Sequence, residues 1–283
     1  MFFSNKNRIF VIVILIVVDL FIWQAIVRGQ INNTELYFLD VGQGDSQLIR
    51  LPGNVKILID GGADAKILGA LAKTLPLQDR YIDLIVITHP QLDHFGGLID
   101  VLKNYEVGAI IDNGRPGTVS AYADLEKTIV KSGALHVSLK EGDVIKYIDK
   151  TIKVLSPSPK NLKSDELNDT SLVIMLEDGL LKALYAGDIG FDVESRLVKK
   201  YKDYLGAQVL KVPHHGSKFS SGSSFLRAVS PKIAVIEVGK NRYGHPTKQT
   251  LQRLAQAGAA ILRTDTSGII KLVFDGQKLS IYR

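Results

Sequence analysis

The sequence predicts an α/β fold of four layers, in which two β-sheets pack against each other and helices cover their outer faces. Beyond residue 30, each half of the chain is rich in predicted strands first and in helices afterwards. Two sheets of this kind bury their apolar faces by packing together, with the helices outside. Material for a core is ample, because 46% of the 283 residues are hydrophobic and 23% are charged, as in globular proteins.

The amino-terminal segment, residues 1–30, is predicted to be a membrane anchor that precedes one domain of residues 31–283. Residues 9–27 include fifteen Ile, Val, Leu and Phe and are interrupted by Asp19 and Gln24. At helical rise this stretch would cover roughly 28 Å, about the hydrocarbon thickness of a bilayer. A cleaved signal peptide is the alternative, but no Ala-x-Ala cleavage site precedes Arg28. We therefore expect one uncleaved transmembrane helix.

Two features of this segment predict its surroundings. Lys6 and Arg8 precede the apolar stretch and Arg28 alone follows it closely, so the positive-inside rule favours a cytoplasmic amino terminus and an extracytoplasmic domain. Asp19 near mid-membrane indicates either a partner helix or self-association, or a carboxylate that snorkels toward water. The predicted location is the cell membrane, with a single pass.

Charge and cysteine content restrict the kind of site. The chain has no cysteine, so a metal would be held by His, Asp, Glu, Asn or Gln. Residues 31–283 carry 32 Lys and Arg against 28 Asp and Glu, whereas a non-catalytic nucleic-acid-binding protein usually shows a stronger basic stripe. A local group of lysines is interpreted as a solvated face, with contact to substrate as the alternative. These are Lys199, Lys200, Lys202, Lys211 and Lys218.

In the first half, short runs of apolar residues predict strands and a longer periodic pattern predicts helices. The expected strands are residues 35–39, 47–51, 56–60 and 83–87, and the expected helices are residues 65–75 and 98–102. The turn Pro52-Gly53-Asn54 makes a hairpin of the second and third strands. Gly42 and Gly44 permit a turn that presses against a site.

The second half alternates in the same way. The expected strands are residues 107–111, 136–139, 172–176, 181–185, 208–212, 233–238, 260–263, 268–274 and 278–282, with further strands between 143 and 155. The expected helices are residues 121–131, 193–201, 224–229 and 247–257. Residues 156–168 form a long loop rich in Pro, Lys, Ser and Asn, and loops of this length are usually functional or disordered.

Polar motifs follow several of these strands directly. The stretch THPQLDHFGG, residues 88–97, places His89, Asp93 and His94 within six residues at the end of a buried strand. Nitrogen and oxygen ligands so close together suit a divalent cation, although a polar turn capped by Asp93 is the alternative. Asp60 and Asp188 also stand at strand ends.

The histidines are concentrated in the same kind of place. Five of the six lie in three motifs at strand ends, and His136, inside a strand, is interpreted as a structural residue. The five are His89, His94, His214, His215 and His245. Scattered core or surface histidines would not segregate in this way, so a metal site is favoured.

Together these motifs carry a resemblance to a known family. Residues 88–97 resemble the HxHxDH signature of the metallo-β-lactamase superfamily, with Gln91 at the second His position. The ordered motifs FLDVGQGDS, LIDGG, THPQLDHFGG, NDTSLV, YAGDI, LKVPHHGS and YGHP resemble the metallo-β-lactamase-like domain of ComEC-type DNA-internalisation competence proteins. The resemblance covers essentially all of residues 31–283 and implies that family's four-layer αββα sandwich.

The resemblance also implies a metal centre. Its ligands would be His89, Asp93, His94, Asp188 as a bridging carboxylate, and either His214 or His215, while Asn168 or Asp169 lies where many members carry another His. Asp60, Asp40 and Gln91 would support the ligands. With two imidazoles fewer than usual and harder oxygen ligands, preference shifts away from Zn²⁺. We expect one or two divalent ions, Mn²⁺ or Zn²⁺.

The implied activity is that of a metal-dependent phosphodiesterase or nuclease acting on DNA, related to competence DNA uptake. Asp93, His215 and His245 would be catalytic, and His245 or the spare imidazole of the His pair would protonate the leaving oxygen. Ser217 and Lys218 would hold phosphate at a helix start, or simply cap that helix.

Two other functions stay open. One is hydrolysis of a small ester, lactone or amide, since this fold hosts many reactions. The other is a non-catalytic nucleic-acid-binding module. Full competence proteins of this type carry many membrane helices, whereas this chain is expected to have one, so DNA uptake would require a membrane partner protein. The oligomeric state stays open.

Overall fold

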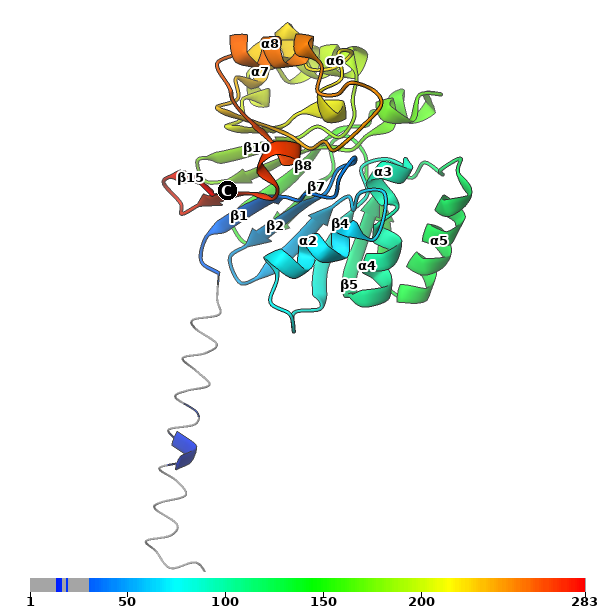
Figure 1. The fold of residues 1–283 in the computed structure, drawn as a ribbon, viewed down its shortest axis with the longest axis vertical. Coiled ribbons are helices and arrows are strands. Elements are labelled where there is room, and N and C mark those ends of the chain that lie inside the picture. Colours follow the sequence, from blue (N-terminus) through cyan, green and yellow to red (C-terminus); the bar gives the residue numbers. More distant parts are fainter. Residues whose placement is uncertain (1–13, 17–18, 20–30, 283) are drawn as a thin grey trace, which may run out of the picture.

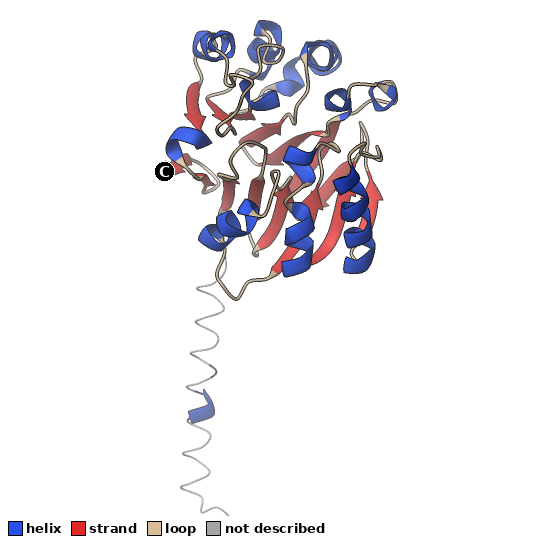
Figure 2. Cartoon of the chain, turned by 45° about the vertical axis from the view of Figure 1, so that its right-hand side comes forward, coloured by secondary structure: helices blue, strands red, loops and turns tan. Residues whose placement is uncertain are grey.

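Two β-sheets and two groups of helices form the four layers that the sequence predicts (Figure 1). The structure is a computed structural model that describes residues 14–16, 19 and 31–282. Strands occupy the middle of the molecule and helices lie on its two outer sides (Figure 2). The αββα sandwich is confirmed.

The first sheet has eight strands in the order β15-β14-β1-β2-β3-β4-β5-β6. Neighbours from β15 to β3 are antiparallel, whereas β3 to β6 run parallel. Its strands are β1 (Thr34–Phe38), β2 (Gln47–Leu51), β3 (Val55–Ile59), β4 (Tyr81–Val86), β5 (Glu106–Asp112), β6 (Leu135–Ser138), β14 (Ile270–Phe274) and β15 (Leu279–Tyr282).

The second sheet has seven strands in the order β13-β12-β11-β10-β9-β8-β7. From β10 to β13 neighbours are parallel. Its strands are β7 (Val144–Tyr147), β8 (Lys150–Ser156), β9 (Val173–Asp178), β10 (Leu181–Tyr185), β11 (Val209–Lys211), β12 (Ile233–Ile236) and β13 (Ala260–Arg263).

The helices belong to one sheet or the other. Those near the first sheet are α2 (Lys66–Thr74), α3 (Leu92–Phe95), α4 (Leu98–Asn104) and α5 (Ser120–Ser132). Those after β10 are α6 (Phe191–Tyr201), α7 (Ser223–Val229), α8 (Lys248–Gln256) and the short α9 (Thr264–Ser267). Short 3-10 turns lie at Asn161–Lys163, Leu167–Thr170, Lys202–Leu205 and Pro213–Gly216, so the long loop is partly ordered by local turns.

Three apolar clusters hold the layers together. Phe38, Ile174 and Val235 belong to the cluster between the sheets. Leu71 and Leu98 belong to the cluster under α2, α4 and α5, and a third lies under α6, α7 and α8. The inner strands of each sheet are therefore buried on both faces, which explains the continuous apolar runs in the inner parallel strands.

The parallel strands bring the predicted site together. The carboxyl ends of β3 and β4 meet in the first sheet, and those of β10, β11 and β12 meet in the second. Ligand sites of open parallel sheets lie at this end of the strands. Asp60 follows β3 and Asp188 follows β10, so residues far apart in sequence reach the same place.

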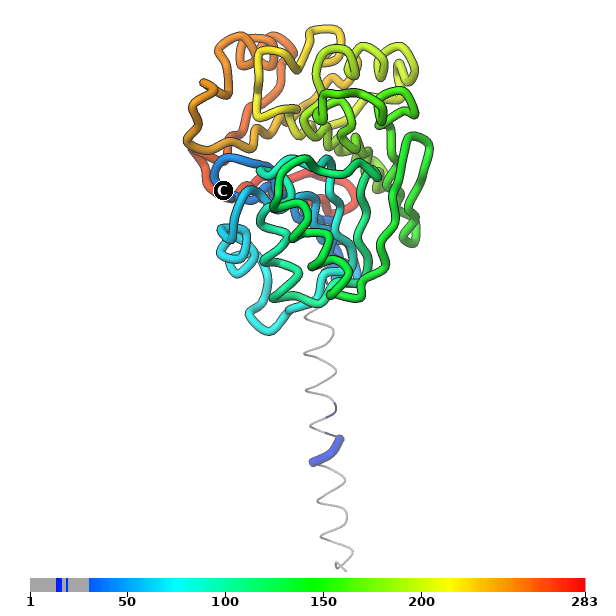
Figure 3. Tube along the Cα trace, turned by 90° about the vertical axis from the view of Figure 1, so that its right-hand side faces the viewer, coloured from blue at the N-terminus to red at the C-terminus, as the bar shows by residue number. Residues whose placement is uncertain are grey.

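The last two strands, β14 and β15, join the first sheet, whose other strands come from the first half of the chain. β14 pairs antiparallel with β1, Leu36 opposite Leu272, and β15 continues that sheet beyond it. The red carboxyl-terminal stretch accordingly lies beside the blue first strand (Figure 3). The expected division into two consecutive halves is wrong for these two strands.

The membrane anchor expected at residues 9–27 lies almost entirely outside the described residues. Among the residues that are described, no helix combines the length and the apolar character needed to cross a bilayer.

Candidate metal centre

The centre lies in a pocket of about 450 Å³ where the two sheets' strand ends meet. The pocket wall contains most of the residues that the sequence singles out, which come from five separate segments between strands. They are Gln91, Asp93, Asn168, Asp188, His214, His215 and His245.

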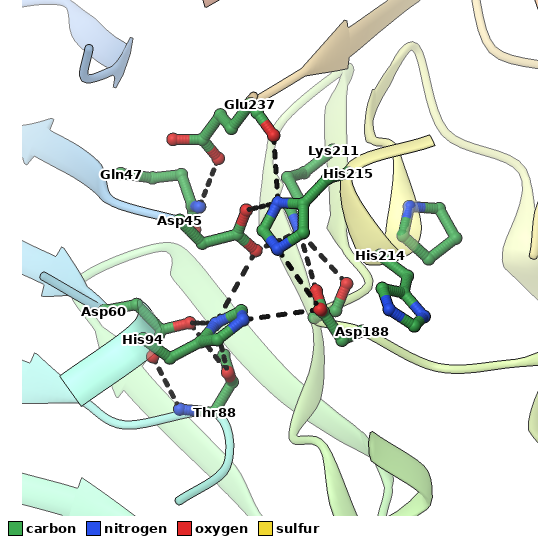
Figure 4. Close-up of polar contacts among 12 residues, drawn as sticks. Asp45, Gln47, Asp60, Thr88, His94, Asp188, Lys211, His214, His215 and Glu237 are labelled. Carbon is green, nitrogen blue, oxygen red and sulfur yellow. Dashed lines mark hydrogen bonds and ion pairs between the residues drawn. The ribbon is translucent and has the colours of Figure 1, made fainter. Parts of the chain in front are cut away.

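His94 is held by a chain of hydrogen bonds below the pocket (Figure 4). Its Nδ1 lies 2.8 Å from Asp60 Oδ2, and Asp60 accepts further hydrogen bonds from Thr88 N at 2.8 Å and Thr88 Oγ1 at 2.7 Å. Because a carboxylate only accepts, Nδ1 carries a proton, which leaves Nε2 as the nitrogen that can bind a cation. That Nε2 faces Asp188 Oδ2 at 3.4 Å.

His215 is oriented in the same way from the second sheet. Its Nδ1 lies 2.9 Å from the backbone oxygen of Glu237 and 3.2 Å from Asp45 Oδ1. Its Nε2 lies 3.4 Å from Asp188 Oδ2 and 3.4 Å from Asp93 Oδ2. The free nitrogens of two imidazoles and two carboxylates therefore converge.

The carboxylates concentrate negative potential in this cluster. Burial would lower the pKa of His215, but Asp188 and Asp45 raise it to about 10. Burial would likewise lower the pKa of His94, which Asp188 and Asp60 instead raise well above its usual value. Burial would raise the pKa of Asp188, which His215 and His94 hold well below its usual range. The cluster thus demands positive charge, as protons or as a cation.

His89 joins the cluster as a neutral imidazole. Its ring centroid lies 4.1 Å from that of His94, and Thr88 Oγ1 is 3.1 Å from its Nδ1. Burial, together with the charge of His94, lowers its pKa to about 3. A neutral imidazole is the form that binds metals.

The residues present fit a divalent cation. Three buried imidazole nitrogens of the cluster make no hydrogen bond within the described structure, namely Nε2 of His89, His94 and His215. Buried polar atoms are normally satisfied, so these atoms are explained by a ligand. Three-residue groups whose ligand atoms lie within 4.8 Å of one another are His89-His94-Asp188, Asp93-His94-His215, Asp45-Asp60-His94 and Asp45-Asp188-His215.

The His pair is divided between two environments. His214 and His215 both have left-handed backbone, with φ of 52° and 50°, which sends their side chains in different directions. His215 enters the cluster, whereas the His214 ring lies 5.6 Å from that of His245 and its Nδ1 lies 3.4 Å from Asn168 Nδ2. His214 belongs to none of the three-residue groups above.

Several known proteins are similar to this chain in sequence. Residues 39–120 match the family described as the metallo-beta-lactamase superfamily. ComE operon protein 3 of Bacillus subtilis (strain 168) is 33% identical over 261 residues, which cover 85% of this chain and 33% of that protein. Competence protein ComA of Neisseria gonorrhoeae is 32% identical over 261 residues, covering 89% and 35%. The chain resembles the ComEC-type competence proteins.

This ComEC-like chain spans about a third of the length of these relatives. Among solved structures, the metallo-beta-lactamase fold protein YhfI from Bacillus subtilis superposes with a TM-score of 0.55 at 11% identity, covering 83% of this chain and 98% of that one. At that identity the likeness shows the fold alone. The solved structure thus matches this chain in fold, and the competence proteins match it in sequence over most of its length.

Three residues of the cluster in this ComEC-like chain are absent from the predicted site. Asp45 lies in the turn after β1, Lys211 ends β11 and Glu237 follows β12. Lys211 is buried and forms an ion pair with Asp45, so its expected place on a solvated face is wrong. Burial would lower its pKa, which Asp45 and Asp188 instead raise, so Lys211 is charged.

Of these three residues, only Asp45 has a signal in the neighbouring sequence. Asp45 adjoins Gly44, where a Cβ atom would lie 2.3 Å from the backbone oxygen of Asp93. The turn is therefore pressed against the THPQLDHFGG motif, as its glycines suggest. By contrast Asp40, the predicted supporting residue, is exposed and its carboxylate accepts a hydrogen bond from Gly42 N. Asp45 rather than Asp40 is the acidic residue of this turn that lies in the cluster.

Ser217 and Lys218 do not stand at a helix start. Helix α7 begins at Ser223, and Ser217 is buried with its hydroxyl accepting a hydrogen bond from Phe219 N at 3.3 Å. Lys218 is exposed and lies 4.9 Å above the Phe219 ring. Neither residue lines the pocket. His136 hydrogen-bonds Asp112 at 2.8 Å outside the centre, as its structural interpretation predicts.

Proposed function

We propose that this chain is a metal-dependent phosphodiesterase that cleaves DNA, in a process related to competence DNA uptake. The observation that carries the proposal is the convergence of His94 Nε2 and His215 Nε2 on Asp188 Oδ2, each at 3.4 Å, beside a pocket. The similarity to competence proteins supports DNA as the substrate.

Asp93, His94, Asp188 and His215 would hold the cation, with His89 beside them. A bound divalent cation would act as a Lewis acid toward a phosphoryl oxygen and neutralise charge that develops there. The mixture of imidazoles and carboxylates suits Mn²⁺ as well as Zn²⁺. Asp60 and the Glu237 backbone would keep the two imidazoles turned toward the ion.

His245 lies at the side of the pocket and moves protons in this proposal. Its side chain is part-buried, and Tyr243 stacks on it with ring centroids 5.7 Å apart. Burial and the neighbouring His214 lower its pKa to about 4. The imidazole is therefore neutral near pH 7, which favours a proton-accepting role over the proton-donating role expected from the sequence.

One observation favours a second substrate class. The pocket volume of about 450 Å³ falls within the range of small-molecule sites, so a small ester, lactone or amide is the alternative. The ligand convergence argues against a non-catalytic module. The membrane anchor at residues 1–30, the extracytoplasmic domain at residues 31–283 and a membrane partner protein complete the proposal and rest on the sequence and the resemblance.

The experiment uses the purified full-length chain with labelled single-stranded and duplex DNA, and in parallel with ester and lactam substrates. Each reaction is run with Mn²⁺, Zn²⁺ or chelator. We expect DNA cleavage with Mn²⁺ that Asp93→Ala reduces about 100-fold or more, as loss of a ligand should. The matched control is Asp40→Ala, which removes an acidic residue outside the cluster. Turnover of the ester or lactam substrates alone would favour the small-molecule hydrolase over the DNA-cleaving enzyme. Metal-independent DNA binding without turnover of any substrate would refute both of these activities.

A further inference from the structure

Lys211 is a buried cation at the heart of the candidate metal centre. It is 1% exposed, and its ammonium group pairs with the Asp45 carboxylate, donates to the backbone oxygen of Gly187 at 3.0 Å and lies 3.5 Å from Asp188 Oδ1. Lysines are almost never fully buried unless paired. We propose that Lys211 is a built-in cation of the centre, which therefore binds one divalent ion per chain rather than two.

The two oxygens of Asp188 face different groups. Oδ2 faces the free nitrogens of His94 and His215, each at 3.4 Å. Oδ1 faces the Lys211 ammonium, as Figure 4 shows. A carboxylate that binds two metal ions through separate oxygens needs both of those oxygens free. In this chain one of those oxygens is directed toward a fixed positive charge.

Backbone geometry fixes the ammonium in this place. Lys211 lies opposite Tyr185 and Val235 on the neighbouring strands, both of which belong to the cluster between the sheets. Its side chain is therefore on the inner face of the second sheet, where it reaches Asp45 from the first. An ammonium held there repels a second divalent ion at short range.

The ligands left for a second ion are also poor. Beyond the residues around Asp188 Oδ2, the remaining candidates are neutral side chains, namely the imidazoles of His89, His214 and His245 and the amides of Gln91 and Asn168. The Asn168 amide nitrogen is turned toward His214 Nδ1 at 3.4 Å. Neutral imidazoles and amides stabilise a doubly charged ion less than carboxylates do. The charge of Lys211 therefore decides whether a second ion binds.

The inference rests on the metal centre proposed above but not on the reaction, so it is tested by counting metal. The full-length chain is freed of metal, loaded with Mn²⁺, desalted and analysed for manganese per chain, and the electron paramagnetic resonance spectrum is recorded. We expect one Mn²⁺ per chain with the spectrum of isolated ions. Lys211→Met, which keeps the length of the side chain without its charge, should bind two and show a magnetically coupled pair. Lys211→Arg, which keeps the charge, should bind one.

Folding of each variant is checked by circular dichroism. If Lys211→Met does not fold, the double variant Lys211→Met with Asp45→Asn restores the balance of buried charge. It is expected to fold and, because the ammonium beside Asp188 Oδ1 is gone, to bind two Mn²⁺. One Mn²⁺ in the folded double variant would overturn the inference. Two ions in the wild type, or one ion in folded Lys211→Met, would overturn the inference while leaving the nuclease proposal intact. Binding of no metal by the wild type would overturn both.

Discussion

At the scale of single residues, the centre depends on side chains that orient the metal-facing nitrogens. Asp60 is buried, holds His94 through Nδ1 and is itself fixed by two hydrogen bonds from Thr88. Partners of this kind set the tautomer and the ring direction of a ligand. Asp60 has a positive φ of 57°, a conformation that Asn also adopts readily. Its role can therefore be tested without disturbing the backbone.

We predict that Asp60→Asn raises the dissociation constant for Mn²⁺ about 10- to 100-fold, because the amide holds the Nδ1 proton of His94 less firmly. Isothermal titration calorimetry on the metal-free chain measures this dissociation constant. The control is Asp112→Asn, since Asp112 holds His136 at 2.8 Å outside the centre. Equal affinities in the two variants would show that Asp60 does not position the ligand.

The residues of the centre differ in how far the sequence could predict them. His89, Asp93, His94, Asp188 and the His pair stand directly after predicted strands, where local sequence announces a site. Lys211 carries no such signal, because a lysine inside a strand usually points to solvent. Its burial follows from pairing with Asp45, 166 positions earlier and in the other sheet.

At the scale of elements, close contacts between glycines and backbone position the metal motif. A Cβ atom on Gly96 would lie 2.2 Å from the backbone oxygen of Ala63. This contact seats the turn between α3 and α4 on the loop that follows β3, so the loops carrying Asp60 and His94 are mutually fixed.

We predict that Gly96→Ala lowers the melting temperature sharply or prevents folding, since backbone rather than a flexible side chain must move. Gly69→Ala is the matched control, because Gly69 is exposed in helix α2 and a Cβ there meets nothing within 4 Å. That change should stabilise the chain by about 0.5–1 kcal/mol through helix propensity. Thermal unfolding followed by circular dichroism compares them, and similar melting temperatures would contradict the tight contact.

Most helices and strands follow from the sequence, because apolar periodicity is a local property. The pairing of β14 with β1 does not, since the strands are more than 230 positions apart and nothing local encodes their meeting. The start of α7 at Ser223 lies one residue from its predicted start, whereas the helix start expected at Ser217 and Lys218 is wrong. The chain between His215 and Ser223 is rich in Ser and Gly, and the structure uses it as an irregular turn rather than as the first turn of a helix.

At the scale of the whole molecule, the candidate ligands join the two sheets. Asp93 and His94 follow β4 of the first sheet, whereas Asp188 and His215 follow β10 and β11 of the second. A cation bound by all four would be part of the contact between the sheets, in addition to the apolar cluster between them. Metal binding and overall stability are therefore coupled.

We predict that removing metal lowers the melting temperature of the full-length chain. With free Mn²⁺ at about 100 times its dissociation constant, binding contributes about 2.7 kcal/mol. For a chain of this size that corresponds to a shift of about 5–11 °C. Scanning calorimetry with Mn²⁺ or with chelator measures the shift, and Asp93→Ala should show a smaller one. A melting temperature unaffected by the chelator would mean that no cation links the sheets.

The left-handed backbone at His214 and His215 also restricts how this site can evolve. Most side chains are disfavoured at φ near 50°, whereas Asn and Asp join His among the residues that tolerate it. A single-nucleotide change in a histidine codon yields either of them, and both bind metals through oxygen. The turn therefore leaves open an evolutionary route by which an imidazole ligand is exchanged for an oxygen ligand while the loop keeps its shape.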